Sequence, residues 1–199
     1  PAYGKPALVE IKNLAEFEEL SMDRKKLIEI AIATAKDSPW LPYIYGKADP
    51  ADGGFDCSGA MYYVMNKAGL KPPRTSAAQY AWLLDAKRMN VVADHATNFD
   101  DPSLKALKPG DLLFWSTGEV VAGLKTLKIT HVALYLGREK KDGLRIMINA
   151  TDGRSYRGVK ANGYGVYDFR IPAKDARSRL VGYGTPPGVA EPTFGSAKD

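Results

Sequence analysis

Hydrophobic positions in the first half of the chain recur with the period of an amphipathic helix. Three segments show this pattern, at residues 21–38, 57–70 and 75–89, and each begins at or beside a residue that can cap a helix. Pro39 ends the first segment and Gly69 ends the second. The shared apolar faces are Leu27, Ile28, Ala31, Thr34 and Ala35 in the first segment, and Cys57, Ala60, Met61, Val64 and Ala68 in the second.

After Pro109 and Gly110 the pattern changes to short runs rich in β-branched and aromatic residues. These runs are "DLLFWS", "THVALYLG", "RIMINAT", "GVYDFRI" and "RLVGYG", separated by glycine or charged turns. Helices followed by a meander of strands indicate an α+β domain. We expect N-terminal helices packed on a central antiparallel sheet of about five strands.

The chain contains no internal repeat and no long linker, so its 199 residues predict one domain with two flanking segments. Residues 1–20 are expected to be an extension that wraps the domain or forms a short first helix. The domain itself is assigned to residues 21–184. Residues 185–199 are expected to be a loose tail.

Composition narrows the class of protein without identifying it. Hydrophobic residues make up 45% and charged residues 26%, as in ordinary globular proteins. The apolar runs are too short to span a bilayer, and no signal peptide is recognisable. Because numbering begins at Pro1, export stays open. The segment from Arg138 to Arg179 contains 11 Lys and Arg against 5 Asp and Glu and so accounts for the whole net charge of +5, but no nucleic-acid-binding motif accompanies it. A nucleic-acid partner is therefore not expected.

Cys57 is the only cysteine, and it lies where the glycine-rich loop "GGFD" meets the second helical segment. One cysteine excludes an internal disulfide and the CxxC pairs of a zinc site, so neither a metal nor another cofactor is expected. At a helix N-terminus, unpaired N–H groups and the helix dipole favour a thiolate nucleophile. The alternative is a buried and inert thiol.

A catalytic thiol requires a base and a polar group that orients the base. His131, within the apolar run "ITHVALYLG", is the better base, because His95 lies in a polar loop. Strand alternation places His131 on one face with Ile129, Ala133 and Tyr135. Asn149 in "RIMINAT" could orient the imidazole, and Asp152 is the other candidate; spacing alone does not decide between them.

Five ordered segments resemble the NlpC-type papain-like cysteine peptidases of bacterial cell-wall metabolism. They are "PYIYGKADPADGGFDCSGAMYYV", "PPRTSAAQYAW", "LKPGDLLFW", "THVALYLG" and "MINAT", within about residues 40–151. The resemblance implies Cys57 as nucleophile, His131 as general base and Asn149 as orienting residue. It also places Tyr43, Asp56, Ser58 and Arg74 at positions that line the substrate site. The family's usual third residue is His, and its usual Gly-Gly pair is Gly46-Lys47 here.

The resemblance implies a peptidoglycan hydrolase that cuts the stem peptide, at the bond between γ-D-glutamate and the diamino acid. Such an enzyme would act in the bacterial envelope or after secretion, either in wall remodelling or as an antibacterial effector with a cognate inhibitor or immunity protein. A monomer is expected. Alternatives are an N-acetylmuramoyl-L-alanine amidase, an acyltransferase or transglutaminase-like enzyme, and a wall-binding module with a silent thiol. If Asp56 binds an ammonium group, stems with a free N-terminal L-alanine are the preferred substrates; Asp56 could equally cap the helix.

Overall fold

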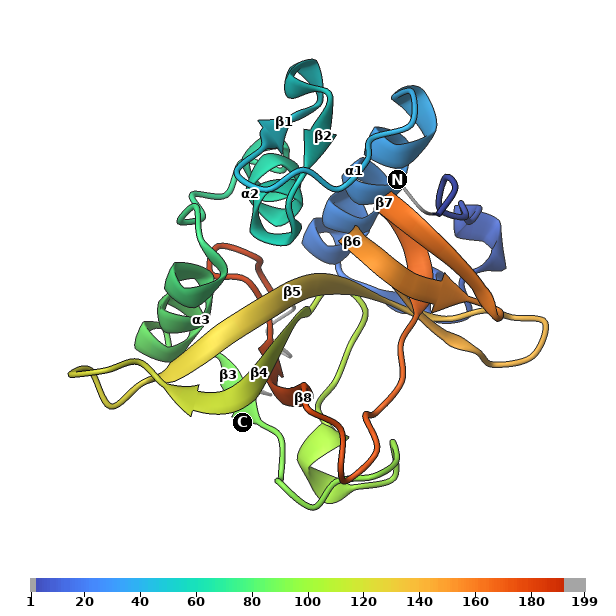
Figure 1. Ribbon diagram of the computed structural model, residues 1–199. Helices are drawn as coiled ribbons and strands as arrows, with labels where there is room; N and C mark the ends of the chain where they lie inside the picture. Colours follow the sequence, from blue (N-terminus) through green and yellow to red (C-terminus); the bar gives the residue numbers. More distant parts are fainter. Residues whose placement is uncertain (1–2, 192–199) are drawn as a thin grey trace, which may run out of the picture.

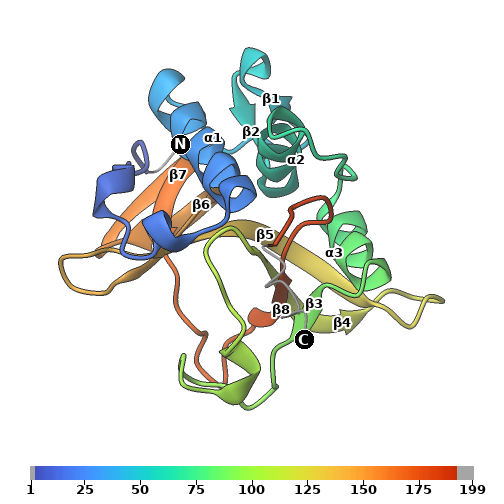
Figure 2. The ribbon, with the colours of Figure 1, turned by 180° about the vertical axis from the view of Figure 1, so that it is seen from behind.

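The computed structural model describes residues 3–191 as an α+β domain. Its α-helices are α1 (Met22–Asp37), α2 (Cys57–Lys67) and α3 (Ser76–Asp85). They gather on the same side of the long strand β5 (Figures 1 and 2). The predicted caps are confirmed, since Ser21 accepts a hydrogen bond from the backbone N–H of Arg24 and Thr75 accepts one from Ala78.

The central sheet has six strands in the order β3-β8-β4-β5-β6-β7, all antiparallel to their neighbours. A separate two-stranded sheet, β1 with β2, leads into α2. The strands are β1 (Ala48–Asp49), β2 (Gly54–Phe55), β3 (Met89–Val91), β4 (Leu112–Val120), β5 (Leu127–Arg138), β6 (Arg145–Tyr156), β7 (Val159–Asp168) and β8 (Arg179–Gly184).

The sixth strand of the central sheet, β3, was not predicted. The third helix was expected to run to residue 89 but ends at Asp85, and Lys87 then takes a positive φ of 56° that turns the chain. Met89–Val91 pairs with β8 at the edge of the sheet. A three-residue edge strand has too short a pattern to distinguish it from the end of a helix.

Two apolar clusters lie on opposite faces of the sheet. The cluster on the helix side contains Val132 and Leu134 of β5 together with buried residues of α1 and α2. The cluster on the other side contains Ala133 and Tyr135 of β5 together with Trp115 of β4. This alternation follows from the two-residue period of a strand. The segment of residues 92–107 covers the second face, as the loop below the sheet in Figure 1 shows.

Both flanking segments pack on the domain as far as they are described. Residues 3–20 run along β7 through isolated bridges at Gly4 and Ala7 and contain two short 3-10 helices, Ile11–Asn13 and Phe17–Glu19. The expectation of a loose tail is wrong for residues 185–191, because Val189 is 2% exposed within the core. The rest of the predicted tail lies outside the described residues. The boundaries assigned to the domain stay a prediction.

Candidate active site

Cys57 is the first residue of α2, as the sequence predicts, and Asp56 is its N-cap. The Asp56 carboxylate accepts a hydrogen bond of 2.6 Å from the backbone N–H of Gly59. Gly59 is required by the close approach of the preceding loop, because a Cβ there would lie 2.0 Å from the carbonyl oxygen of Lys47. The loop and the helix start thus hold Cys57 between them.

Asp56, Ser58 and Arg74 form one hydrogen-bonded cluster beside the thiol. Arg74 donates to both carboxylate oxygens of Asp56, at 3.2 and 3.0 Å, and to the Ser58 hydroxyl at 2.9 Å. Gly46 also donates its backbone N–H to Asp56 at 2.8 Å. Burial by itself raises the pKa of Asp56, but the hydrogen bonds from Arg74, Gly59 and Gly46 hold it below its ordinary value. A negative charge therefore persists next to Cys57 at neutral pH.

His131 and Asn149 lie where β5 and β6 separate. The ladder between these strands ends at the pair Leu134 and Ile148, and the strands diverge beyond it. Across this opening, the amide of Asn149 forms a short hydrogen-bonded contact with the Nε2 atom of His131. The thiol lies against the same part of β5, because the backbone N–H of Val132 points to its sulfur. The thiol therefore lies beside the strand residue that follows His131, and His131 in turn contacts Asn149.

A bulge in β5 corrects one predicted detail. His131 pairs with Trp115, whereas Ile129 pairs with Ser116, so Thr130 is an extra residue between them. Ile129 therefore joins the core on the helix side, while Ala133 lies on the other face. The predicted shared face of Ile129 with His131 and Ala133 is wrong, because simple alternation does not survive a bulge.

The amide orientation of Asn149 decides the tautomer of His131. With the Nδ2 atom towards the ring, the Oδ1 atom is buried without a partner. Rotating the amide by 180° lets Oδ1 accept from the Nε2–H group, and the two orientations differ only in the assignment of O and N. In the rotated form the Nδ1 lone pair is left free to take a proton from the thiol.

The pKa values of the thiol and the imidazole shift in opposite directions. Burial raises the pKa of Cys57 above its ordinary value, against the opposing effect of the backbone N–H group of Val132. Burial, together with the positive charge of Arg154, lowers the pKa of His131 well below its ordinary value. Contrary to the sequence expectation, the helix N-terminus does not produce a net lowering of the thiol pKa. The two shifts favour a neutral thiol beside a neutral imidazole.

Tyr43 is the remaining residue of the predicted substrate site. It bridges to Phe55 in the strand before Cys57, and its backbone N–H donates to the Asn162 side chain at 3.0 Å. Burial, with the nearby Cys57 and Asp56, raises the pKa of its hydroxyl to about 12. The phenol therefore stays protonated at neutral pH and can donate a hydrogen bond.

Sequence reasoning missed two residues of the site, Trp115 and Arg154. The indole of Trp115 lies 5.3 Å from the imidazole of His131, ring centre to ring centre. The guanidinium of Arg154 lies 4.8 Å from the centre of the Trp115 ring. The pairing of β4 with β5 could have suggested Trp115, but Arg154 reaches this position through a bulge in β6 that the sequence pattern does not show.

The competing candidates form no hydrogen bond with His131 in the part of the chain that the structure describes. The side chain of His95 is 83% exposed and lies 3.6 Å from the Asp101 carboxylate in the loop after β3. Asp152 is exposed on β6, and the contact with His131 is made by Asn149. Residues 3–191 contain no group of three or more His, Cys, Asp or Glu side chains placed to hold a metal ion.

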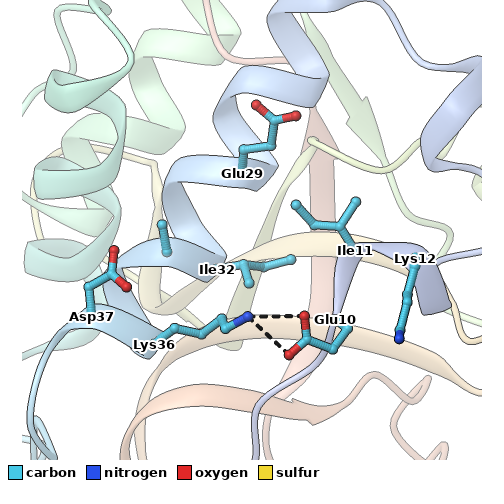
Figure 3. A pocket seen from close by; sticks show the side chains of 8 residues that line it. Glu10, Ile11, Lys12, Glu29, Ile32, Lys36 and Asp37 are labelled. Atoms are coloured by element: carbon cyan, nitrogen blue, oxygen red, sulfur yellow. Dashed lines mark hydrogen bonds and ion pairs between the residues drawn. The ribbon is translucent and has the colours of Figure 1, made fainter.

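A pocket outside this site lies against α1 (Figure 3). It is lined by the exposed ion pair of Lys36 with Glu10 and by Ile32. It contains no residue of the Cys57 cluster. No helix of the described residues is long and apolar enough to cross a membrane.

The fold is that of a papain-like domain, in which Cys57 begins a helix and His131 lies on the sheet. The family model of the NlpC/P60 family matches residues 41–169, a range that contains Cys57, His131 and Asn149. The chain belongs to the NlpC/P60 family.

Curated relatives carry the names of an endopeptidase and a glutamyl hydrolase. The chain is 34% identical over 137 residues to the probable endopeptidase p60 of Listeria monocytogenes, covering 68% of this chain and 22% of that protein. It is 31% identical over 161 residues to the gamma-DL-glutamyl hydrolase of Bacillus subtilis, covering 79% and 31%. The match thus spans less than a third of either relative.

Among solved structures, the chain is similar to the peptidoglycan hydrolase RipB of Mycobacterium tuberculosis. The identity is 23% and the TM-score is 0.46, over 84% of this chain and 69% of that one.

Proposed function

We propose that this protein is a cysteine endopeptidase that cleaves the stem peptides of bacterial peptidoglycan. The observation that supports the proposal is the position of Cys57 at the start of α2, with its sulfur towards the backbone N–H of Val132. Val132 follows His131, whose Nε2 atom contacts Asn149. A nucleophile, a base and an orienting group in this order constitute a catalytic unit for acyl transfer.

The reaction begins with attack of the Cys57 sulfur on the amide carbonyl, while the thiol proton passes to the Nδ1 atom of His131. The imidazolium then donates this proton to the leaving amine, and a thioester remains on Cys57. Water hydrolyses the thioester with His131 again acting as base. Backbone N–H groups at the start of α2 stabilise the developing oxyanion. Because the thiol and imidazole start neutral, proton transfer accompanies the attack.

The bond that we assign is the one between γ-D-glutamate and the diamino acid. The gamma-DL-glutamyl hydrolase of Bacillus subtilis acts by its name on γ-linked glutamate, and the p60 relative is named as an endopeptidase. Asp56, Ser58, Arg74 and Tyr43 form the wall of the site on the side of α2. We assign the binding of the stem's free amino terminus to the Asp56 carboxylate, together with the hydroxyls of Ser58 and Tyr43. No cofactor is part of this mechanism.

The substrate places the activity in the bacterial envelope or outside the cell. Whether the protein remodels its own wall or attacks another bacterium is a question of delivery, and an immunity protein would belong only to the second role. A monomer suffices for the mechanism, because every proposed catalytic residue comes from one chain.

The experiment is digestion of purified sacculi and of defined stem tetrapeptides, with identification of the fragments by mass spectrometry. New termini at γ-D-glutamate and at the diamino acid are expected, and Cys57→Ala should abolish them while leaving the unfolding transition unchanged. Release of intact stems from muramic acid would make the enzyme an amidase. An equally active Cys57→Ala variant would refute the proposal.

A further inference from the structure

Arg154 reaches the candidate site because β6 bulges. Asp152 pairs with Asn162 and Ser155 pairs with Lys160, so β6 has one residue more than β7 over this interval. Gly153 takes a φ of +87° within the bulge, a backbone conformation that suits glycine. A bulge of this kind changes the direction of the side chain that follows it. The guanidinium of Arg154 lies over Trp115, and the ring of Trp115 lies beside His131.

The guanidinium of Arg154 forms no ion pair among the described residues, whereas five other arginines do. Ion pairs with an Asp or Glu are formed by Arg24, Arg74, Arg138, Arg157 and Arg170. Among residues 3–191, Arg154 has neither a carboxylate within ion-pair distance nor a hydrogen-bond partner. Its side chain is partly buried, and burial lowers its pKa. A desolvated cation without a partner costs stability, and such a cost is common at binding sites.

The arrangement suits an anionic ligand. Stacking on an indole fixes the plane of the guanidinium and leaves its N–H edge free. That edge matches a carboxylate with two parallel hydrogen bonds. Arg154 also lies near enough to Cys57 for the two charges to interact, so a group bound there would be next to the reacting bond. The Asp56 carboxylate, by contrast, already receives hydrogen bonds from Arg74, Gly59 and Gly46.

From this geometry we infer that Arg154 binds a substrate carboxylate adjacent to the scissile amide and thereby selects acidic over amidated peptides. The inference rests on the proposed function, because it concerns the substrate of that same site. A γ-linked glutamate bears a free α-carboxylate close to its scissile carbonyl. The residue on the leaving side bears another. Both are the same chemical group, and amidating one at a time distinguishes them.

The test uses three synthetic stem peptides: one with both carboxylates free, one with the γ-linked residue's α-carboxylate as carboxamide, and one with the leaving-side carboxylate as carboxamide. They are compared with wild type, Arg154→Gln and Arg154→Lys. Arg145→Gln is the matched control, because Arg145 also lies in β6 and also stacks on an aromatic ring, 4.3 Å from the centre of Phe99, but away from Cys57. Thermal unfolding verifies that each variant is folded.

For wild type, one of the two amidated peptides should show a kcat/KM about 10- to 100-fold below that of the free acid, the ratio expected for losing a charge-assisted hydrogen bond. The kcat/KM of Arg154→Gln should be lower than that of wild type by the same factor on the free-acid peptide. On that amidated peptide the two enzymes should have the same kcat/KM. Arg154→Lys should fall between the two, and Arg145→Gln should discriminate like wild type. The inference would be overturned if Arg154→Gln lowered kcat/KM equally on the acid and amidated peptides, or if it kept the wild-type preference for the acid peptide.

Binding separates this inference from the proposed function. Isothermal titration of the same peptides into Cys57→Ala and into Cys57→Ala/Arg154→Gln requires no turnover. If wild type binds the acid peptide but cleaves none of the peptides, the proposed endopeptidase activity fails. The inference about Arg154 then stands only under two conditions. Cys57→Ala/Arg154→Gln must bind the acid peptide about 10- to 100-fold more weakly than Cys57→Ala does. The two variants must also bind equally well the amidated peptide that lacks the carboxylate held by Arg154. Failure of the acid peptide to bind Cys57→Ala overturns it.

Discussion

Asn149 contacts the Nε2 atom of His131 across the opening between β5 and β6, from a strand position that pairs with β7 rather than with β5. The contact therefore depends on how far the two strands diverge after Leu134. Because Nε2 is occupied by this contact, Nδ1 is the ring nitrogen that remains to act as a base.

Asn149 orients the imidazole without carrying charge, so Asn149→Ala should lower kcat by about tenfold, the value of one hydrogen bond, and leave measurable activity. Asn149→Asp should instead raise the pKa of His131, because a carboxylate stabilises the imidazolium. Activity requires the neutral imidazole and is lost as the pH falls through this pKa. The acid limb of the pH–rate profile should therefore move to higher pH in Asn149→Asp.

Asp152→Ala is the control for Asn149→Ala, since Asp152 is the other candidate for orienting the His131 imidazole and is exposed on the same strand. Near-wild-type kcat is expected. A loss larger than that of Asn149→Ala would assign the orienting role to Asp152.

His131→Ala should reduce kcat/KM by about 100- to 10,000-fold, the usual contribution of a general base. The chain offers a matched control in His95→Ala, which removes the only other histidine from an exposed loop and should leave the rate unchanged. Steady-state kinetics on a stem tetrapeptide make the comparison. A strong effect of His95→Ala with a weak effect of His131→Ala would reverse the assignment.

Cys57 should react slowly with iodoacetamide at neutral pH, because burial raises its pKa and the low pKa of His131 denies the thiolate an imidazolium partner. The alkylation rate should be below that of an unstructured thiol at pH 7 and rise only at pH values above the ordinary thiol range. A mass-spectrometric time course at several pH values measures it. Faster alkylation than the reference thiol at pH 7 would indicate a thiolate–imidazolium pair instead.

Asp56→Asn retains a side chain that can cap α2 but removes the charge that pairs with Arg74. The free energy of unfolding should fall by about 1–3 kcal/mol at pH 7, since the Asp56 side chain is 10% exposed and Arg74 loses its anionic partner. The folded pKa of Asp56 lies below its ordinary value, so this stabilisation is fully present above the unfolded pKa. It should disappear as the pH falls through the folded pKa.

Urea unfolding of wild type and Asp56→Asn between acidic and neutral pH tests this dependence. Asp49→Asn serves as the control, because Asp49 also caps a short helix but is exposed and forms no ion pair with an arginine. A constant difference between wild type and Asp56→Asn at all pH values would show that the charge does not contribute. The same variant, compared on free and muramic-acid-linked stems, tests amine binding: equal rates on both substrates in wild type would restrict Asp56 to its structural role.

Local chemistry was sufficient to predict the helices, their caps and the position of Cys57 at the start of α2. Ser21, Asp56 and Thr75 cap their helices because each side chain accepts a hydrogen bond from the backbone N–H three residues later. Such an interaction depends only on a short stretch of sequence, so it can be predicted from that stretch. The strands of the central sheet other than β3 were predictable for a similar reason, since short runs of β-branched and aromatic residues between turn residues indicate a strand from local sequence.

Tertiary structure decided the relationships between strands. The bulge at Thr130 turns His131 away from the face of Ile129, and the bulge at Gly153 carries Arg154 to Trp115. Neither follows from a residue pattern, because a bulge is defined by the register with a partner strand. The choice of Asn149 over Asp152 as the neighbour of His131 depends in the same way on where β5 and β6 separate. The net rise of the Cys57 pKa came from burial, which only the packed fold determines.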